Sequence, residues 1–323
     1  MVRHQGQAGH VPPGKGMAPV EAERKKQGIM GESVKKEFWY VMVEGIIDEN
    51  HGGIANFYGY GTHLGEVIGH VLSAAEETGF ASPHAVETGF VESDYEMPDD
   101  LETLNDHVQW SPSRYLFPVL DYGSMMVLPT GIVHAAGDPE NDPDLIREAF
   151  YTYGHEKNSQ NEYGLDLVVS RLRLRDTFFS FIRFLSDING LFFRVAGFED
   201  DENAPYEIWA FYDSDPETLI NILAGNTTDT LENGYVEIAV TASEGETRST
   251  LILDSHKHIS FFSRDERIFA EAIRLAETLG FEETGDLYHV EAGYYHWHYR
   301  PAASRRRRDF FQWLDENDFD RVE

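Results

Sequence analysis

Short stretches of alternating hydrophobic and polar residues, separated by capped helical stretches, run through the middle of the chain. Leu165 to Leu174 has the spacing of a half-buried strand, and Leu191 to Val195 and Tyr206 to Tyr212 have the composition of two more. Phe178 to Leu185 carries apolar residues around most of a helical circumference, which predicts a largely buried helix. Asn189-Gly190 is expected to end that helix, because glycine adopts a left-handed C-terminal conformation at little cost.

A second helix is predicted directly after these strands. Asp215-Pro216-Glu217 combines a capping carboxylate, a proline at the first helical position and an acid favoured by the helix dipole. A strand from Tyr235 to Thr241 follows, and a later helix is expected from Asp265 to Leu279. The order β-α-β-β-α-β up to Thr241 predicts a ferredoxin-like sandwich.

The N-terminal part of the chain shows the same kind of pattern. Glu37 to Asp48 alternates like a strand, a hairpin turn follows at Glu49 to Gly53, and Ile54 to Tyr60 returns as a second strand. A helix capped by Thr62 is expected to run to Thr78, and His84 to Glu92 has the pattern of another strand.

The pattern is weaker in the remaining segments. Glu96 to Pro118 is predicted to be a structured loop or a short helix at a domain edge, Tyr122 to Val133 a strand and Pro143 to Tyr151 a short helix. After Phe281, two further strands are expected at Asp286 to Glu291 and Tyr294 to Tyr299.

These elements predict an α+β protein of two domains, each an antiparallel or mixed sheet with helices packed on one face. We expect an N-terminal domain at residues 37–136, a turn-rich acidic linker at 137–164 and a C-terminal domain with the ferredoxin-like order at 165–323. Residues 1–36 are rich in Gly, Pro and Lys and lack periodicity, which predicts a disordered leader. A basic anchoring arm is the alternative, and translation could also begin at Met17 or Met30.

Composition narrows the class of protein. The chain has 323 residues, 41% hydrophobic and 13% aromatic, which is enough for two cores and is typical of globular proteins. No window approaches about 18 consecutive apolar residues, and no secretory signal pattern is present, so we expect a cytoplasmic protein without a membrane partner. The absence of cysteine excludes disulfides, thiolate nucleophiles and cysteine metal sites.

Charge is the strongest compositional feature. The formal net charge is −31, and residues 1–36 hold seven basic and three acidic residues (+4), so residues 37–323 carry −35. Such a surplus repels nucleic-acid phosphates, which argues against a nucleic-acid partner. It favours long-range attraction to a basic protein partner. A requirement for solubility, or a salt-adapted host proteome, would produce the same composition.

Histidines are the main candidates for chemistry. His256 and His258 lie two residues apart on a predicted strand and so share a face, and His296 and His298 do the same. If the two strands were neighbours, these four imidazoles could converge on zinc or another divalent metal, with His289 nearby. The alternative is that each pair lies on a solvated sheet face.

Two other clusters of polar side chains could serve either a binding site or the fold itself. His63, Glu66 and His70 span about 60° of a predicted helix, opposite its apolar stripe, which fits either a metal site or a solvated face. Arg305 to Arg308 opens a C-terminal helix expected to be capped by Ser304. These arginines could bind phosphate or RNA, but the neighbouring acids weaken the local field, so we expect them to dock on the protein's own acidic surface.

Two resemblances bear on function. The segment from Ser255 to Phe281, under a tenth of the chain, resembles the strand–helix–Gly-Phe unit of the acidic regulator that inhibits ribonuclease E. The chain as a whole, acidic, cysteine-free and α+β, resembles bacterial immunity proteins. Neither likeness rests on a diagnostic motif, and we assign no family.

Taken together, these features predict an intracellular acidic protein-binding module: an adaptor, inhibitor or immunity-type protein that engages a basic partner. No nucleophile elbow, Walker loop or dinucleotide fingerprint is present, so an enzyme with a bound cofactor is not expected. The alternative is a metal-dependent hydrolase that uses the paired histidines described above. The sequence leaves the partner's identity and the oligomeric state open.

Overall fold

The computed structural model describes residues 37–91, 95, 97–121, 123–127, 129, 132–134, 147–154, 162–198, 204–212, 214–245, 247–285, 287, 296–298, 300–301 and 303–322. Within these residues the protein is mixed α+β, as predicted, with five helices and two large sheets. The predicted leader, residues 1–36, lies outside the described residues.

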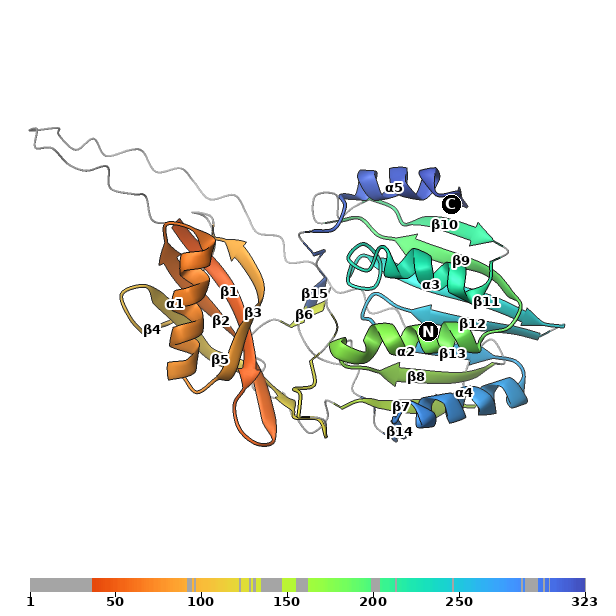
Figure 1. Ribbon diagram of the computed structural model, residues 1–323, viewed down its shortest axis with the longest axis horizontal. Helices are drawn as coiled ribbons and strands as arrows, with labels where there is room; N and C mark the ends of the chain where they lie inside the picture. The colour runs from red at the N-terminus through yellow and green to blue at the C-terminus, as the bar shows by residue number, and fades with distance from the viewer. Residues whose placement is uncertain are drawn as a thin grey trace, which may run out of the picture. The chain divides into compact units, whose positions relative to one another are not determined.

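The first sheet, termed the N-terminal sheet, is antiparallel and has the strand order β3-β1-β2-β5-β4. Helix α1 (Leu64–Glu77) lies on one of its faces (Figure 1). The strands are β1 (Glu37–Ile46), β2 (His51–Gly61), β3 (Ala81–Phe90), β4 (Glu102–Thr103) and β5 (Val108–Pro118).

Helix α1 begins one residue later than predicted. Its N-cap is His63, whose Nδ1 accepts a hydrogen bond of 3.1 Å from the backbone N–H of Glu66. Glu66 Oε2 in turn accepts 2.7 Å hydrogen bonds from the backbone N–H and the hydroxyl of Thr62, a reciprocal capping arrangement. Gly79 follows the helix with φ 99°, a left-handed conformation that glycine adopts without steric cost.

Strand β5 lies in the segment from Glu96 to Pro118 that was predicted to be a loop or a short helix, so that prediction was wrong for this part. Pro112 argued against a strand here, because proline has no N–H to donate to the hydrogen bonds of a sheet. In the structure Trp110 pairs with Phe57 and Arg114 pairs with Ala55, and the register shifts between these pairs. Pro112 therefore lies at an irregularity of the ladder, where a proline is tolerated.

The second sheet, termed the C-terminal sheet, has the order β14-β7-β8-β13-β12-β11-β9-β10-β16 and is antiparallel except between β14 and β7. Its strands are β7 (Ala149–Tyr153), β8 (Tyr163–Val168), β9 (Ile188–Val195), β10 (Glu207–Tyr212), β11 (Val236–Glu244), β12 (Thr247–Leu253), β13 (Ile259–Ser263), β14 (Glu282–Glu283) and β16 (Asp320–Arg321). A separate two-stranded sheet pairs β6 (Ile132–His134) with β15 (His296–His298).

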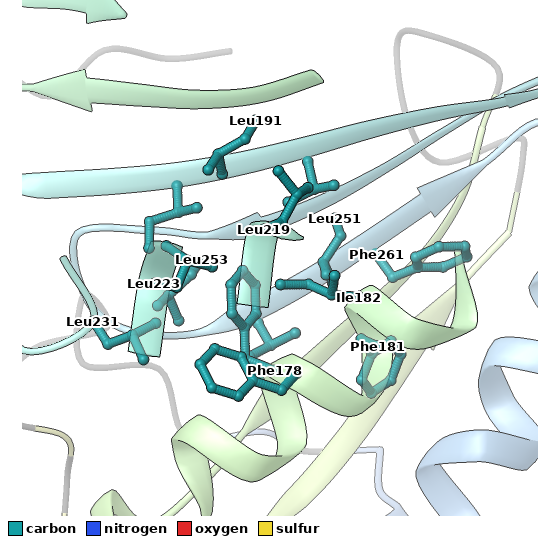
Figure 2. Close-up of a cluster of buried hydrophobic side chains, with 14 of the residues drawn as sticks. Phe178, Phe181, Ile182, Leu191, Leu219, Leu223, Leu231, Leu251, Leu253 and Phe261 are labelled. Atoms are coloured by element: carbon teal, nitrogen blue, oxygen red, sulfur yellow. The ribbon is translucent and has the colours of Figure 1, made fainter. Parts of the chain in front are cut away.

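Helices α2 (Arg171–Phe184), α3 (Pro216–Ala224), α4 (Glu266–Thr278) and α5 (Arg307–Glu316) bury their apolar sides in one cluster with the C-terminal sheet. Figure 2 shows the centre of this cluster, where Phe178 of α2 lies near Leu223 of α3 and Phe181 of α2 lies beside Phe261 of β13. The cap predicted for α3 at Asp215 is confirmed, and Asp265 caps α4 in the same way: each accepts backbone hydrogen bonds from the first helical turn. None of the described helices has the length and apolar character needed to cross a membrane.

The chain order β8-α2-β9-β10-α3-β11 is the predicted β-α-β-β-α-β, but the structure does not confirm a ferredoxin-like sandwich. In that fold the first and third strands of the unit are the central pair. Here β8 pairs with β13, and β10 pairs with β9 and β16. The hairpin β12–β13 separates the unit's first strand from its last, because strands later in the chain complete the sheet.

The boundary between β8 and α2 was also predicted wrongly. The strand expected to reach Leu174 ends at Val168, and Leu174 is a buried residue of α2. The helix expected to end at Asn189-Gly190 ends at Phe184. Asn189 and Gly190 lie in β9 instead. Leucines spaced by two residues fit a short strand as well as the start of a helix, so periodicity alone could not decide.

Two smaller predictions need correction. Ala149 to Tyr151, placed in a short helix, belongs to β7. Of the described residues between Tyr122 and Val133, only Ile132 and Val133 lie in a strand, while Met125 makes an isolated bridge to Val119. These segments have few residues and little periodicity, so their partners in the fold determine their structure.

The arginines at the start of α5 dock on the protein itself, as expected, although the N-cap is Arg306 and not Ser304. Arg305 donates to Asp229 through its guanidinium and, at 2.6 Å, through its backbone N–H. Arg307 donates to the backbone carbonyls of Ala196 at 3.0 Å and Pro205 at 2.7 Å. The side chain of Arg308 is 93% exposed, whereas those of Arg305 and Arg307 are 37% and 13% exposed.

The two sheets have separate main cores, and a third cluster takes residues from both. Tyr115 and Phe117 of β5 pack there with Met126 and with Val168 of β8. Glu44 of β1, 3% exposed, forms an ion pair with Arg171 of α2. Strand β7 lies inside the predicted linker 137–164 and pairs with β8. The division into two domains stays a prediction.

A fully buried lysine closes the hairpin between β12 and β13. Lys257 has φ 61°, and its Nζ donates to the backbone carbonyls of Val236 at 2.9 Å and Thr230 at 3.4 Å. Burial lowers the pKa of Lys257 to about 7, although Asp254 and Glu237 oppose the shift. The unfolded chain, with its ordinary pKa of 10.5, therefore binds one more proton than the folded protein between pH 7 and 10.5.

We expect the free energy of unfolding to rise with pH across that window, by about 1.4 kcal/mol per pH unit from this one group. Lys257→Met should remove this contribution, because a thioether of similar length does not titrate. Denaturant unfolding of both proteins at several pH values measures the difference, since all other titrating groups are shared. Parallel curves for the two proteins would contradict the prediction.

Candidate functional site

The face of the N-terminal sheet that points away from α1 carries a row of aromatic side chains. We refer to this surface as the tyrosine face and define it by Phe38, Tyr40, Tyr58, Tyr60 and Tyr95. Across β1 and β2, Phe38 is opposite Tyr60 and Tyr40 is opposite Tyr58, and opposite residues share a face. Helix α1 packs its apolar side on the other face of this sheet, while Arg171 of α2 meets Glu44 near the far end of β1.

Ring contacts make the tyrosine face continuous. Phe38 stacks on Tyr60 with ring centroids 4.2 Å apart, and Tyr58 lies 6.0 Å from Phe38, 5.8 Å from Tyr40 and 6.3 Å from Tyr95. Tyr58 is fully buried at the centre, whereas Tyr60 and Tyr95 are 38% and 47% exposed. The result is an aromatic surface with a closed centre and two open ends.

Hydrogen bonds hold the tyrosine hydroxyls in place. The hydroxyl of Tyr58 lies 3.3 Å from that of Tyr95, and the hydroxyl of Tyr40 donates to Asn56 Oδ1 at 3.3 Å. Burial, with a further effect of Tyr95, raises the pKa of Tyr58 above its ordinary value of 10, so this phenol stays protonated. The hydrogen bonds orient the rings, and the Tyr58 hydroxyl does not act as an anionic nucleophile.

Asp100 supplies a negative charge at the rim of the tyrosine face. Its Oδ2 accepts hydrogen bonds from the hydroxyls of Ser111 at 2.6 Å and Ser113 at 2.8 Å, both on β5. The bond from Ser111 is the largest cause that holds the pKa of Asp100 below its ordinary value, so the carboxylate is charged at neutral pH. The connection from β3 to β4 therefore brings both Tyr95 and this carboxylate against the sheet.

Glu87 supplies a second carboxylate at the β3 edge of the same face. Glu87 is half-buried and is opposite Met42 of β1. Met42 follows Tyr40 by two residues, so it lies on the same face as Tyr40. The Oε2 of Glu87 is buried, and no donor in the described part of the chain reaches it. Desolvation raises the pKa of Glu87 above its ordinary value of 4.5. Carboxylates that are desolvated without a partner are common at binding sites.

The tyrosine face is suited to binding cations. Aromatic ring faces attract Lys and Arg cations, and nearby carboxylates add charge attraction and hydrogen-bond acceptors. It is less suited to nucleophilic catalysis, because the hydroxyls of Ser111 and Ser113 donate to Asp100 and not to a histidine base. We therefore identify the tyrosine face as the candidate functional site.

Sequence reasoning missed this site but held part of the signal. The alternation of Phe38 and Tyr40 with the core residues of β1 predicted that these rings share a face. Glu87, Tyr95 and Asp100 could not be placed, because β3 and the connection after it reach the face only through the strand order. Nothing in their spacing separates them from the other carboxylates and tyrosines of the chain.

The structure places the first predicted histidine pair in a turn and not on a strand. His256 and His258 precede β13, in the hairpin turn where the backbone N–H of His258 donates to Asp254 Oδ1 at 2.9 Å. The two imidazole rings are 6.2 Å apart between centroids. His258 is 5% exposed, and its Nδ1 lies 3.8 Å from Asp254 Oδ2. This geometry explains His258 as part of the turn.

The second predicted pair lies on another sheet. His296 and His298 are on β15, which pairs with β6 and not with β13. Their side chains lie outside the described part of the structure, so convergence of all four histidines stays a prediction. Among the side chains that the structure does describe, no group of three or more His, Asp or Glu residues is arranged to hold a metal ion.

The stripe on α1 has structural roles. His63 and Glu66 form the reciprocal cap of the helix, as described above. His70 stacks on His107 of the β4–β5 connection with ring centroids 4.5 Å apart. The stripe therefore caps the helix and packs against the next connection.

A cavity of about 430 Å³ lies beside β7 and β14, and its two arginines have partners within the protein. Arg173 donates to Glu148 at 2.6 Å and stacks over Phe281, 4.2 Å from the ring centroid. Arg147 donates to Thr284. Because these arginines already have acceptors inside the protein, this cavity is a weaker candidate than the tyrosine face.

Glu87→Gln should stabilise the protein at neutral pH, because it removes a desolvated charge. The folded protein holds the proton of Glu87 more tightly than the unfolded chain, so this group lowers the free energy of unfolding as pH rises above 4.5. The advantage of the variant should be present at pH 7 and should vanish below pH 4.5. Unfolding curves at both pH values measure it; an equal advantage at both would contradict the stated cause.

We expect the protein, purified without a histidine tag, to contain no stoichiometric zinc, manganese or iron, because the first histidine pair lies in the turn before β13 and the second lies on β15, in a different sheet. Elemental analysis of the intact chain measures this. Stoichiometric metal that is lost in both His258→Ala and His296→Ala would contradict the expectation and would favour a metal-dependent hydrolase.

Comparison of the chain with known protein families, with curated proteins and with solved structures gave no match. The functional argument therefore starts from the side chains of the tyrosine face and from the charge of the chain.

Proposed function

We propose that this protein is an intracellular acidic protein-binding module, an adaptor, inhibitor or immunity-type protein that engages a basic protein partner. The observation that carries the proposal is the tyrosine face, where exposed aromatic rings and carboxylates lie together on a sheet. Interfaces are enriched in tyrosine because its ring buries a large area with few torsions to fix, and its hydroxyl finds hydrogen bonds.

The charge of the chain supports a basic partner. Residues 37–323 carry −35, which raises the rate of encounter with a positively charged protein over distances of about a Debye length, or ~8 Å at physiological ionic strength. At the tyrosine face itself, Asp100 is held in its charged form by two serine hydroxyls. Long-range attraction would bring the partner close, and the aromatic rings would supply the contact area.

A division of labour between two domains is also part of the proposal. The N-terminal domain, residues 37–136, presents the tyrosine face, and the C-terminal domain, residues 165–323, has its own larger core. Separate cores support this division, since each sheet buries its apolar residues against its own helices.

The intact chain should recover a basic protein from an extract of its own cell at about 0.05 M salt, and recovery should fall several-fold at about 0.5 M salt because the attraction is screened. Tyr60→Ser combined with Tyr95→Ser should reduce recovery at least tenfold. Quantitative mass spectrometry of the captured proteins measures both effects.

Phe90→Ser is the matched control. Phe90 is 53% exposed on the same sheet but is opposite Trp39, on the face that packs with α1. Its variant should recover the partner as well as the unchanged chain does. Recovery of no basic protein at low salt, or equal losses for the control and the double variant, would contradict the proposal.

A further inference from the structure

The two large sheets end in four outer strands, and β3 differs from the other three. Strands β4, β14 and β16 have two residues each, and every one of them includes an acidic residue. Outer strands that are short and charged discourage the pairing of a further strand. Strand β3 has ten residues, none of them buried. In the part of the chain that the structure describes, β3 is therefore the one long outer strand of these sheets.

One half of β3 carries features that discourage pairing, and the other half does not. Pro83 has no N–H to donate, and two shifts of register against β1 lie between Ala81 and Glu87. Prolines and bulges of this kind protect a sheet edge. From Glu87 to Phe90, by contrast, each residue of β3 is opposite the next residue of β1 without interruption. We refer to Glu87 to Phe90 as the open edge.

The hydrogen bonds to β1 show which groups of the open edge point outwards. The N–H of Val91, directly after β3, donates to the carbonyl opposite it on β1 at 3.0 Å. Hydrogen-bonded pairs alternate with non-bonded pairs in an antiparallel ladder, so Gly89 and Glu87 also bond to β1. Thr88 and Phe90 lie between them, so their N–H and C=O groups point away from β1. The open edge thus presents two donors and two acceptors to a further strand.

Charge indicates what kind of strand fits the open edge. Glu87 lies in it, on the side of the tyrosine face, and no described donor reaches its buried Oε2. A further strand would place one residue beside Glu87 on this face, and opposite charges in such cross-strand positions attract. A second copy of this chain would instead bring together two molecules that each carry a net charge of −31, which disfavours pairing between copies.

We propose that the open edge binds an extended, basic segment of the protein partner as an antiparallel strand added to the N-terminal sheet. The inference rests on the proposed function, since the segment belongs to the basic partner. Main-chain hydrogen bonds to Thr88 and Phe90 hold the segment, and a Lys or Arg opposite Glu87 selects a basic sequence. The orientation is that of every strand pair in this sheet.

The test uses the full chain and a short capped peptide in which lysine alternates with threonine, a residue that favours strands. Amide hydrogen exchange measured by NMR should slow at least tenfold at Thr88 and Phe90 when the peptide is saturating. The amides of Glu87 and Gly89 should change much less, because they are already bonded to β1. Unchanged exchange at Thr88 and Phe90 in the presence of bound peptide would overturn the proposal.

Two matched peptides separate strand addition from general attraction to an acidic protein. In the proposed strand, the residues opposite Thr88 and Phe90 direct their N–H groups to β3, and the residue opposite Glu87 directs its own away. With lysine opposite Glu87, the inward N–H groups are those of the threonines. Methylation of the threonine main-chain nitrogens should weaken binding at least tenfold in calorimetry, whereas methylation of the lysine main-chain nitrogens should leave it unchanged. Equal affinities of the two methylated peptides would contradict strand addition.

Thr88→Pro tests the same hydrogen bonds from the side of the protein. It removes an N–H that points away from β1, a position at which an outer strand tolerates proline. Binding of the lysine–threonine peptide should weaken at least tenfold. Thr88→Val and Phe90→Ser keep the main-chain donors and should bind like the unchanged chain. If thermal unfolding shows that Thr88→Pro does not fold, hydrogen exchange and the methylated peptides decide.

Charge selection is tested separately. The peptide with glutamate in place of lysine should not bind, and Glu87→Gln should weaken binding of the lysine peptide at least threefold. Glu76→Gln, which removes a carboxylate from the exposed surface of α1, is the matched control and should have no effect. Equal losses in the two variants would overturn the role of Glu87, and a dimer of the free chain that Thr88→Pro abolishes would assign the edge to a second copy instead.

The outcomes separate this inference from the proposed function. If the chain captures a basic partner that depends on Tyr60 and Tyr95, but Thr88→Pro changes neither capture nor peptide binding, strand addition is wrong and the function stands. If the peptide protects Thr88 and Phe90 but no basic partner is captured, strand addition stands and the protein-binding function fails.

Discussion

The structure depends on one constraint: each large sheet is covered by helices on a single face. In a strand, successive side chains point to opposite faces, so a strand under a helix presents every second residue to the other side. In the C-terminal sheet that geometry builds a continuous core with four helices. In the N-terminal sheet it leaves a face on which Phe38, Tyr40, Tyr58 and Tyr60 are aligned by the pairing of β1 with β2.

The polar groups of the tyrosine face follow from that alignment. Tyr58 is fully buried away from α1, and the hydroxyl of Tyr95 lies 3.3 Å from its own hydroxyl. Asp100 stays charged there because two serine hydroxyls of β5 donate to it. Glu87 differs, because its buried oxygen has no described donor. Buried polar groups are normally hydrogen-bonded, as Tyr58 and Asp100 are here, so the buried oxygen of Glu87 is the exception that needs an explanation.

Basic residues contribute to the fold in this acidic chain. Arg305 and Arg307 attach the segment before α5 to Asp229 and to backbone carbonyls, and Arg171 meets the buried Glu44. Lys257 is buried where it can donate to two carbonyls. These cations are bonded to acceptors within the protein. The acidic residues outnumber the basic ones and give the molecule its negative charge, which favours a positively charged partner.

Some features of this protein are determined by sequence alone. The caps at Asp215 and Asp265, the left-handed Gly79 and the alternation of β1 depend on neighbours a few residues away, so local pattern was sufficient for them. Net charge and the α+β class also follow directly from the residues. Pro112 and Leu174 were misplaced because each depends on which distant strand or helix it meets.

Only the tertiary structure decided the strand order and the candidate site. Insertion of β12–β13 between β8 and β11 separates strands that the chain order had suggested were close. Pairing of β3 with β1 brings Glu87 and Gly89 beside Tyr40, although more than forty residues separate them in the chain. Pairing free energy depends on the whole set of contacts that a sheet makes, so no local stretch of sequence specifies the partner of a strand or the residues that meet across it.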